Sequence, residues 1–275
     1  MQRKTTKVRC VRLTRIGSAG PPGSLLLSVK HVLSVSVTLA VLVGCGTDSS
    51  GSAVAAPGPG PAERSVFLDP GHSGLSDSSI TRQVPNGRDG TKDCQTTGTS
   101  TSSGYPEHAF NWDVVNRIRT RLEAQGVSVQ LSRPNDTELG PCIDQRADEA
   151  NAMKPDAIVS IHADGGPEWG RGFHVIYSSP PLNDTQAVTS VGFAELMRDT
   201  LRSKGLEEAN YIGSGGLMGR ADLAGLNLYE YPGILVELGN MRNADEAAKM
   251  ESVEGRAAYA DSVADGISAF LQTKG

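Results

Sequence analysis

The sequence lacks the excess of positive charge that proteins binding nucleic acids need. Its 275 residues include 26 Lys and Arg against 31 Asp and Glu, which gives a formal net charge of -5 and a pI near 5.6. Binding to a phosphate backbone depends largely on clustered Lys and Arg side chains. We therefore expect no nucleic acid among the partners of this protein.

The sequence also lacks a hydrophobic run long enough to form a permanent membrane helix. Residues 32–43 form an apolar run of about a dozen residues, whereas a spanning helix needs roughly 20. Basic side chains crowd the chain before this run, namely Arg3, Lys4, Lys7, Arg9, Arg12 and Arg15. A basic start followed by a short apolar run is typical of an export signal, which we predict over residues 1–44. Translation starting near Val29 would give a more compact signal of the same kind.

The predicted signal ends in Leu42-Val43-Gly44-Cys45, which resembles the lipobox of bacterial lipoproteins. This resemblance implies that Cys45 is lipidated after the preceding peptide is removed, and the alternative is an ordinary cleaved signal. Residues 45–63 are rich in Gly, Ser, Ala and Pro, which predicts a flexible tether. We expect an exported protein of the cell envelope. It would be anchored to the outer face of the cytoplasmic membrane through Cys45, or otherwise secreted to the cell wall.

Cysteine is scarce, with four residues in the whole chain and three of them in the predicted exported region. If Cys45 carries lipid, Cys94 and Cys142 remain as a pair in an oxidising compartment, where a disulfide is the default state. A cysteine metal ligand is the alternative, but neither residue has a Cys or His neighbour at zinc-finger spacing. The disulfide would fasten the polar segment 73–104, which is too long for an ordinary connection.

From residue 64 onward the chain alternates short apolar runs with amphipathic segments, which predicts one catalytic domain over residues 64–273. We expect strands near residues 65–68, 127–131, 157–161, 173–177 and 234–236, and helices near residues 110–122, 143–153, 185–204 and 254–271. The alternation of strands and helices predicts an α/β fold, with a mixed, mostly parallel twisted sheet flanked by helices.

Side chains that can bind metal follow three of the expected strands. His72 comes after the first strand, His162 after residues 157–161 and Glu237 after residues 234–236. In open α/β sheets such positions converge on one crevice. Glu107 opens the first long helix, where the helix dipole alone would favour a carboxylate. Two histidines and one glutamate around an open fourth position is the arrangement that zinc hydrolases use to cleave amides.

Five ordered segments resemble the zinc-dependent N-acetylmuramoyl-L-alanine amidase family, especially its compact single-domain secreted members, over about residues 66–271. These segments are Phe67-Leu-Asp-Pro-Gly-His72, Tyr105-Pro-Glu107-His108, Leu131-Ser-Arg133 followed by Asp136 and Arg146, Asp156-Ala-Ile-Val-Ser-Ile-His162-Ala-Asp164, and Pro232-Gly-Ile-Leu-Val-Glu237-Leu-Gly-Asn240. The sequence departs from the family after His72, where Ser73-Gly74-Leu75-Ser76 replaces a Gly-rich run with an Asp. This departure affects the expected loop conformation and not the ligand.

The resemblance implies a zinc-exopeptidase-like amidase fold with one zinc ion per chain. It implies that His72, Glu107 and His162 bind zinc, that Glu237 is the catalytic carboxylate, and that His108 faces elsewhere. The implied reaction is hydrolysis of the amide between N-acetylmuramic acid and L-alanine in peptidoglycan or muropeptides. In that reaction zinc would activate a water molecule, and Glu237 would act first as general base and then as general acid.

Two other functions fit the same pattern: a zinc peptidase acting on other peptides, and a non-catalytic wall-binding homologue. We expect Arg171 and Asn240 to contact the peptide stem or to order the site. The chain is expected to be a monomer whose contact with a membrane is limited to a lipid at Cys45.

Overall fold

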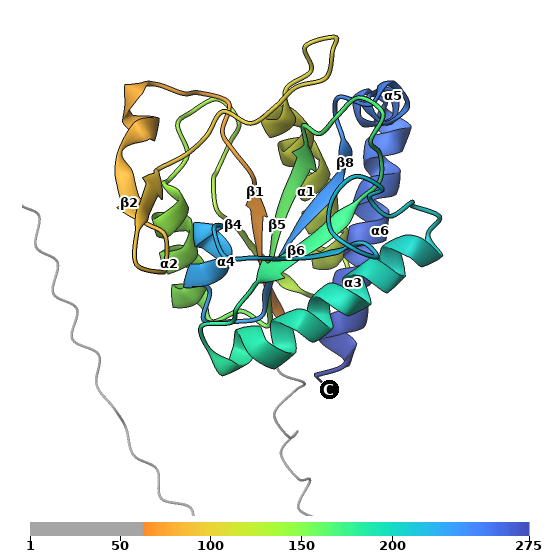
Figure 1. Cartoon of the computed structure of the whole chain (residues 1–275). Coiled ribbons are helices and arrows are strands. Elements are labelled where there is room, and N and C mark those ends of the chain that lie inside the picture. Colours follow the sequence, from red (N-terminus) through yellow and green to blue (C-terminus); the bar gives the residue numbers. More distant parts are fainter. Residues whose placement is uncertain (1–62, 275) are drawn as a thin grey trace, which may run out of the picture. The chain divides into compact units, whose positions relative to one another are not determined.

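The structure, a computed structural model, describes residues 63–274 (Figure 1). The export signal predicted over residues 1–44, the lipidation site predicted at Cys45 and nearly all of the tether predicted over residues 45–63 lie outside the described residues. Among residues 63–274, no helix has the length and apolar character needed to cross a membrane. The first strand begins at Ser65 and the last helix ends at Gln272.

A six-stranded sheet lies at the centre, in the order β4-β1-β5-β8-β6-β7. The strands are β1 (Ser65–Pro70), β4 (Ser128–Leu131), β5 (Ala157–Asp164), β6 (His174–Ser178), β7 (Leu217–Arg220) and β8 (Gly233–Asn240). Strands β4, β1, β5 and β8 run parallel, whereas β6 pairs antiparallel with β8, and β7 runs parallel to β6. The predicted mixed, mostly parallel sheet is therefore confirmed.

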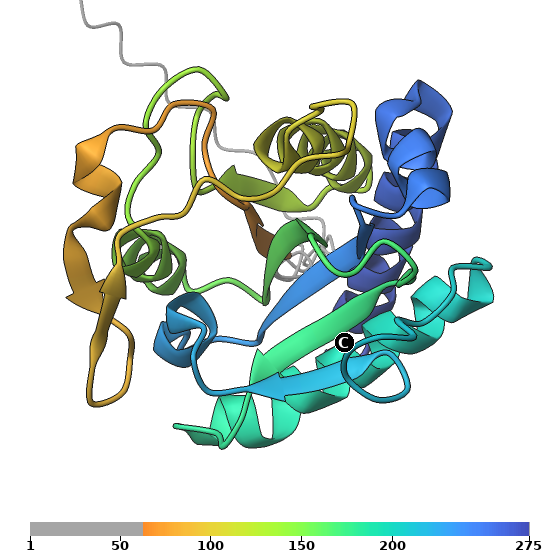
Figure 2. The same cartoon turned by 45° about the horizontal axis from the view of Figure 1, so that its top comes forward.

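Helices cover both faces of the sheet (Figures 1 and 2). One face carries α1 (Glu107–Glu123), α3 (Val191–Ser203) and α6 (Val253–Gln272), and the other carries α2 (Ile143–Met153) and α4 (Ala224–Leu228). A π-helical turn (Thr185–Ser190) leads into α3, and α5 (Ala244–Glu251) precedes α6. Because both faces are covered, the central strands consist largely of apolar residues without polar alternation.

Alternation along the strands decides which face each side chain enters. On β5, Ala157 and Val159 join the core beneath α1 and α6, whereas Ile158 joins the core beneath α2 and α4. On β8, Val236 and Leu235 divide between the two cores in the same way. Since side chains alternate with a period of two, residues two and four positions beyond Ile158 project toward the α2 and α4 side.

The sequence patterns did not predict several short elements. These are a 3-10 helix (Ser78–Thr81), a hairpin of β2 (Gln83–Pro85) and β3 (Thr91–Asp93), and the elements β7, α4 and α5. Strands of three residues in a polar segment show no hydrophobic alternation, and a five-residue helix shows less than two turns of periodicity. These elements therefore depend on tertiary contacts that a local pattern does not report.

The predicted disulfide between Cys94 and Cys142 is present and spans 48 positions of the sequence. It joins the segment after β3 to the residue that precedes α2, and the Ile143 amide donates a hydrogen bond to the Cys94 carbonyl at 2.9 Å. Val84 of β2 packs against both cysteines. The hairpin is thus fastened to the helical layer, as expected for the long polar segment.

Replacing both Cys94 and Cys142 with Ser should lower the free energy of unfolding by about 4 kcal/mol, because a closed loop of 48 residues restricts the unfolded chain. Urea denaturation of both proteins, with and without a reducing agent, measures this difference. The reducing agent should destabilise the wild type and leave the double variant unchanged. Equal stability of the two proteins under oxidising conditions would contradict the expected contribution.

Candidate active site

Strand pairing brings two of the predicted site residues together at the carboxyl end of the sheet. His162 on β5 and Glu237 on β8 are register partners in neighbouring parallel strands. His162 lies four positions after Ile158, and Glu237 lies two positions after Leu235, so both follow residues of the core beneath α2 and α4. The sheet therefore places an imidazole and a carboxylate side by side on one face.

His72 reaches the same place through a sharp turn after β1. Its backbone φ of 61° lies in the left-handed region, which is uncommon for a residue other than glycine. Gly71 allows the close approach, because a Cβ atom there would lie 2.2 Å from the His162 ring. Strained backbone of this kind often occurs at functional sites, where the surrounding structure holds it in place.

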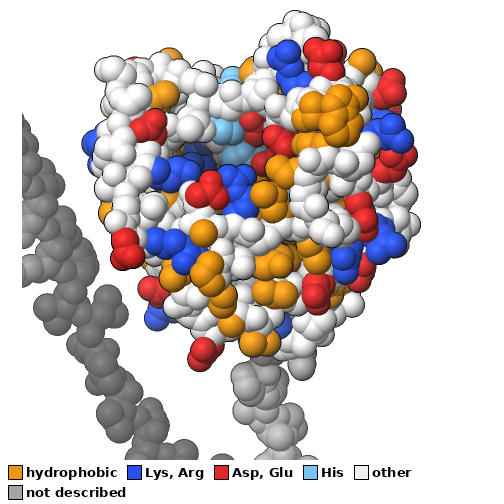
Figure 3. Space-filling model, viewed as in Figure 1, with side chains coloured by type: hydrophobic (Ala, Val, Ile, Leu, Met, Phe, Trp, Pro, Cys, Tyr) orange, Lys and Arg blue, Asp and Glu red, His pale blue; other side chains and the backbone are white. Residues whose placement is uncertain are grey.

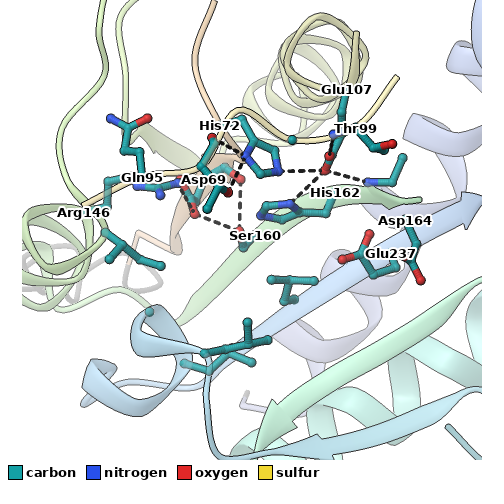
Figure 4. Close-up of a pocket in the computed structure, with 18 of the residues that line it drawn as sticks. Asp69, His72, Gln95, Thr99, Glu107, Arg146, Ser160, His162, Asp164 and Glu237 are labelled. Carbon is teal, nitrogen blue, oxygen red and sulfur yellow. Dashed lines mark hydrogen bonds and ion pairs between the residues drawn. The ribbon is translucent and has the colours of Figure 1, made fainter. Parts of the chain in front are cut away.

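His72, Glu107 and His162 form one compact group of donor atoms (Figure 4). Glu107 Oε1 lies 3.1 Å from His72 Nε2 and 3.0 Å from His162 Nδ1. One donor atom from each of the three residues lies within 4.8 Å of the others. Two imidazole nitrogens and a carboxylate oxygen at this spacing could hold a divalent metal ion.

Backbone groups of the segment after Cys94 orient these donors. His72 Nδ1 lies 2.8 Å from the Thr96 carbonyl oxygen, which can only accept a hydrogen bond. A proton on Nδ1 satisfies this contact, and it leaves the lone pair of Nε2 to bind a metal ion. Glu107 Oε2 accepts a hydrogen bond from the Thr99 amide at 2.9 Å, and Oε1 accepts one from the Ala163 amide at 3.2 Å.

Gly98 permits this segment to cover the donors closely. Its φ of 74° favours glycine, and a Cβ atom would lie 2.7 Å from Glu107 Oε2 and 2.8 Å from His72 Cδ2. The disulfide at Cys94 lies four residues earlier, so the fastened segment is the same one that holds both donors. The disulfide therefore fastens the segment that contacts the candidate metal-binding group.

The electrostatics of the group favour the protonation states that bind metal. Burial acts to raise the pKa of Glu107, but hydrogen bonds to His162 and His72 outweigh it and hold this pKa well below the ordinary 4.5. Burial lowers the pKa of His162 below its ordinary value, despite the opposing effect of Glu107. An ionised carboxylate beside a neutral imidazole is the combination that metal coordination requires.

Glu237 has the opposite electrostatic character. Burial raises its pKa well above 4.5, and the carboxylates of Glu107 and Asp164 raise it further. Its Oε2 atom is buried without a hydrogen-bond partner among the described residues. Figure 4 places Glu237 beside Asp164, on the strand next to that of His162. A carboxyl group with a raised pKa next to a metal-binding group can both accept and return a proton.

A buried ion pair lies beneath the donors. Arg146 Nη1 contacts Asp69 Oδ1 at 2.9 Å, and the hydroxyls of Ser132 and Ser160 donate to the same carboxylate at 2.6 and 2.7 Å. Burial raises the pKa of Asp69, but Arg146 and the two hydroxyls outweigh it and lower the pKa to about 2. Because Ser160 is two residues before His162, this network braces the strand that carries a donor.

The three donor residues line a cavity of about 420 Å³. In Figure 3 histidine surface is visible inside a hollow on this side of the molecule. Beyond the donors and Glu237, the wall includes Ile143 of α2, Leu226 of α4, Tyr229 and Lys92. The cavity therefore combines a polar, metal-competent end with a partly apolar extension between α2 and α4.

The structure places the remaining residues singled out in the sequence away from the donor group. Arg171 is half exposed, pairs with Glu207 at 2.6 Å and lies outside the lining of this cavity. Asn240 is fully buried, its side-chain amide donates to the carbonyls of Pro167 and Gly170, and its predicted role stays a prediction. His108 faces away from the donors, as the resemblance implied, and contacts Asp136 at 2.9 Å.

Comparison with known proteins identifies the family. Residues 66–269 match the family model described as N-acetylmuramoyl-L-alanine amidase. The chain belongs to this amidase family. It is 61% identical over 210 residues to the N-acetylmuramoyl-L-alanine amidase Rv3717 of Mycobacterium tuberculosis, covering 76% of this chain and 87% of the relative.

Two solved amidase structures are also similar to the chain. The Ami1 amidase of Mycobacterium smegmatis has a TM-score of 0.76 at 58% identity, covering 76% of this chain and 97% of Ami1. The apo form of Ami1 from Mycobacterium abscessus has a TM-score of 0.75 at 58% identity, covering 76% and 98% of the two chains. The amidase family and its α/β fold, expected from five ordered sequence segments, are therefore confirmed.

Replacing Asp69 with Asn should destabilise the protein by about 3 kcal/mol at neutral pH, because Arg146 would remain buried without its counter-charge. The pKa of Asp69 lies below its ordinary 3.8, so its ionic contribution of roughly 2 kcal/mol is complete above pH 3.8 and is lost as the pH falls through about 2. Urea denaturation between pH 7 and pH 2 measures both effects.

The stability difference between wild type and Asp69→Asn should shrink as the pH falls, because the wild-type carboxyl group then becomes neutral as well. Asp199→Asn is a matched control, since the ion pair of Asp199 with Arg198 is largely exposed on the aspartate side. This control should change stability little at any pH. A difference for Asp69→Asn that stays constant down to pH 2 would show that the charge of Asp69 does not contribute.

Proposed function

We propose that this chain is a zinc-dependent N-acetylmuramoyl-L-alanine amidase, which hydrolyses the amide between N-acetylmuramic acid and L-alanine in peptidoglycan. The single observation that carries this proposal is the convergence of His72, Glu107 and His162 next to the partly buried carboxyl group of Glu237. The identity of 61% to an amidase from M. tuberculosis supports the substrate assignment.

Zinc is the metal that these donors suit best. A borderline-soft ion prefers imidazole and carboxylate ligands, and three protein ligands leave the open position that a catalytic site needs. The contact of His72 Nδ1 with the Thr96 carbonyl favours the tautomer that a metal-binding imidazole requires. When bound, zinc would supply Lewis acidity that lowers the pKa of a water molecule and polarises the scissile carbonyl.

Glu237 moves the proton in this proposal. Its carboxylate takes a proton from the attacking water as the new carbon–oxygen bond forms, and then gives it to the amine nitrogen of L-alanine as the carbon–nitrogen bond breaks. Its buried position raises the pKa of the carboxyl group, which favours holding the proton between the two steps. The unpartnered Oε2 leaves one oxygen of the carboxyl group without a competing hydrogen bond.

We also propose that the protein acts outside the cytoplasmic membrane as a monomer. The disulfide between Cys94 and Cys142 supports this location, because structural disulfides persist in oxidising compartments. The export signal predicted over residues 1–44 supports the same location. Cys45 would anchor the protein to the membrane if lipidated, and otherwise the protein would be secreted to the cell wall.

Two substitutions separate the role of the metal ligands from that of the catalytic carboxylate. Glu237→Gln should keep zinc and lower kcat by about 10²- to 10⁴-fold, because it removes proton transfer alone. His162→Ala should lose both zinc and activity, because it removes a ligand. Metal analysis together with muramyl dipeptide hydrolysis measures both effects. Equal loss of zinc from the two variants would contradict the assigned roles.

His108→Asn is the matched histidine control, since its ring contacts Asp136 and not the donor group. This variant should retain both zinc and activity.

The substrate assignment has its own test. Incubation of the zinc-loaded protein with muramyl dipeptide should release a peptide that begins with L-alanine, detected by mass spectrometry. A chelator should abolish this release, because hydrolysis needs the metal. Faster cleavage of simple peptides than of muramyl dipeptide would favour a peptidase. Absence of hydrolysis of any substrate by the zinc-loaded protein would favour a non-catalytic wall-binding protein.

A further inference from the structure

The segment between β5 and β6 displays a large aromatic side chain that contacts no core. Trp169 is 67% exposed, although tryptophan has one of the largest apolar surfaces of any residue. The segment leaves β5 at the same sheet edge as the catalytic residues and passes toward α5 (Figures 1 and 2). In Figure 3 hydrophobic surface lies on this rim of the hollow that contains the histidines.

The backbone on both sides of Trp169 is held firmly. Asn240 donates hydrogen bonds to the carbonyls of Pro167 and Gly170 at 2.7 and 2.8 Å, and the side-chain amide of Asn243 donates to the Glu168 carbonyl at 3.0 Å. The Gly170 amide also donates to the Pro167 carbonyl at 2.8 Å. A rigid backbone thus presents the indole ring to solvent, an arrangement that lowers the entropic cost of binding a ligand.

This segment is continuous with the wall of the catalytic cavity. Asp164 and Gly165, at its start, line the cavity together with Glu237. Tyr211 donates to Asp164 at 3.0 Å, and its ring packs so closely on the segment that a Cβ atom at Gly170 would lie 2.6 Å from it. The segment that carries Trp169 therefore begins in the wall of the catalytic cavity, and Trp169 itself lies outside the lining.

The size of the cavity, about 420 Å³, limits which part of the substrate can lie wholly inside it. Ile143 of α2, Leu226 of α4 and Tyr229 line one part of the cavity, and Asp164 and Gly165 at the start of the segment that carries Trp169 line another. A glycan strand continues in both directions from the reacting sugar, so its neighbouring sugars extend beyond the cavity.

The chemistry around Trp169 suits a sugar. The face of an indole ring is electronegative and attracts the electropositive C–H groups of a pyranose face. Arg171 pairs with Glu207 at 2.6 Å, and both side chains are more than half exposed. Glu168, next to Trp169 in the sequence, is also exposed. These side chains can form hydrogen bonds to sugar hydroxyls. The negative charges of Glu168 and Glu207 would repel an anionic membrane surface, which argues against a membrane as the alternative ligand.

We propose that Trp169 is a stacking platform for a sugar of the glycan strand next to the reacting N-acetylmuramic acid. This inference rests on the proposed amidase function and adds a binding subsite for the carbohydrate polymer. The platform gives the domain affinity for polymeric substrate through its own surface.

Kinetics on two substrates test the platform in the zinc-loaded full chain. Trp169→Ala should lower kcat/KM about tenfold on uncross-linked glycan strands carrying peptide stems, and should leave muramyl dipeptide hydrolysis unchanged, because that substrate lacks a neighbouring sugar. Trp169→Phe keeps an aromatic face and should restore most of the rate on strands. Leu182→Ala is the matched control, since Leu182 is 46% exposed and follows the opposite end of β6.

Equal losses on both substrates, or no loss on the strands, would overturn the proposal. Tryptophan fluorescence gives a readout that does not need activity, because the chain contains two Trp residues. A β-1,4-linked N-acetylglucosamine tetrasaccharide should change the emission of the wild type and not that of Trp169→Phe, which keeps Trp112. The absence of any change in the wild type would also overturn the proposal. Failure to hydrolyse both muramyl dipeptide and glycan strands, with the fluorescence change retained, would in contrast refute the amidase function alone.

Discussion

The position of one carboxylate oxygen, Glu107 Oε1, is the constraint on which the rest of the site depends. This atom contacts ring nitrogens of both His72 and His162, so it joins the turn after β1, the start of α1 and the end of β5. The buried carboxylate is satisfied by backbone amides at Thr99 and Ala163. A buried charge needs such partners, because leaving one unpaired costs more free energy than most single interactions supply. Gly71 and Gly98 permit the close backbone approach that this arrangement needs, and the disulfide at Cys94 fastens the segment that contains Thr99.

The sequence was most informative where a strand ends in a chemically distinctive residue. His72, His162 and Glu237 each follow an apolar run, and parallel strands bring such ends to one edge, as the pairing of His162 with Glu237 shows. Glu107 was different, because a glutamate at a helix start has an ordinary explanation in the helix dipole. Only its resemblance to a family segment indicated its place, and the structure brings it to the histidines.

Other parts of the site could not be read from the sequence, because they depend on backbone groups or on burial. Any residue type at position 96 offers the carbonyl that contacts His72, and any except proline at position 99 offers the amide that contacts Glu107, so no pattern reports these contacts. Asn240 follows Glu237 closely, yet its amide turns inward to hold the loop that carries Trp169. Asp69 and Arg146 belonged to the matched segments, but their pairing required the packing of α2 against β1.

The route of the disulfide links oxidation of the chain to the metal binding proposed above. The bond holds the segment whose carbonyl and amide contact His72 and Glu107, so forming it would lower the entropy lost when those residues capture an ion. By thermodynamic reciprocity, an ion bound there would favour closure of the same bond. Under the proposed function, oxidation and metal capture would therefore be cooperative, and a reduced chain would bind the ion less tightly.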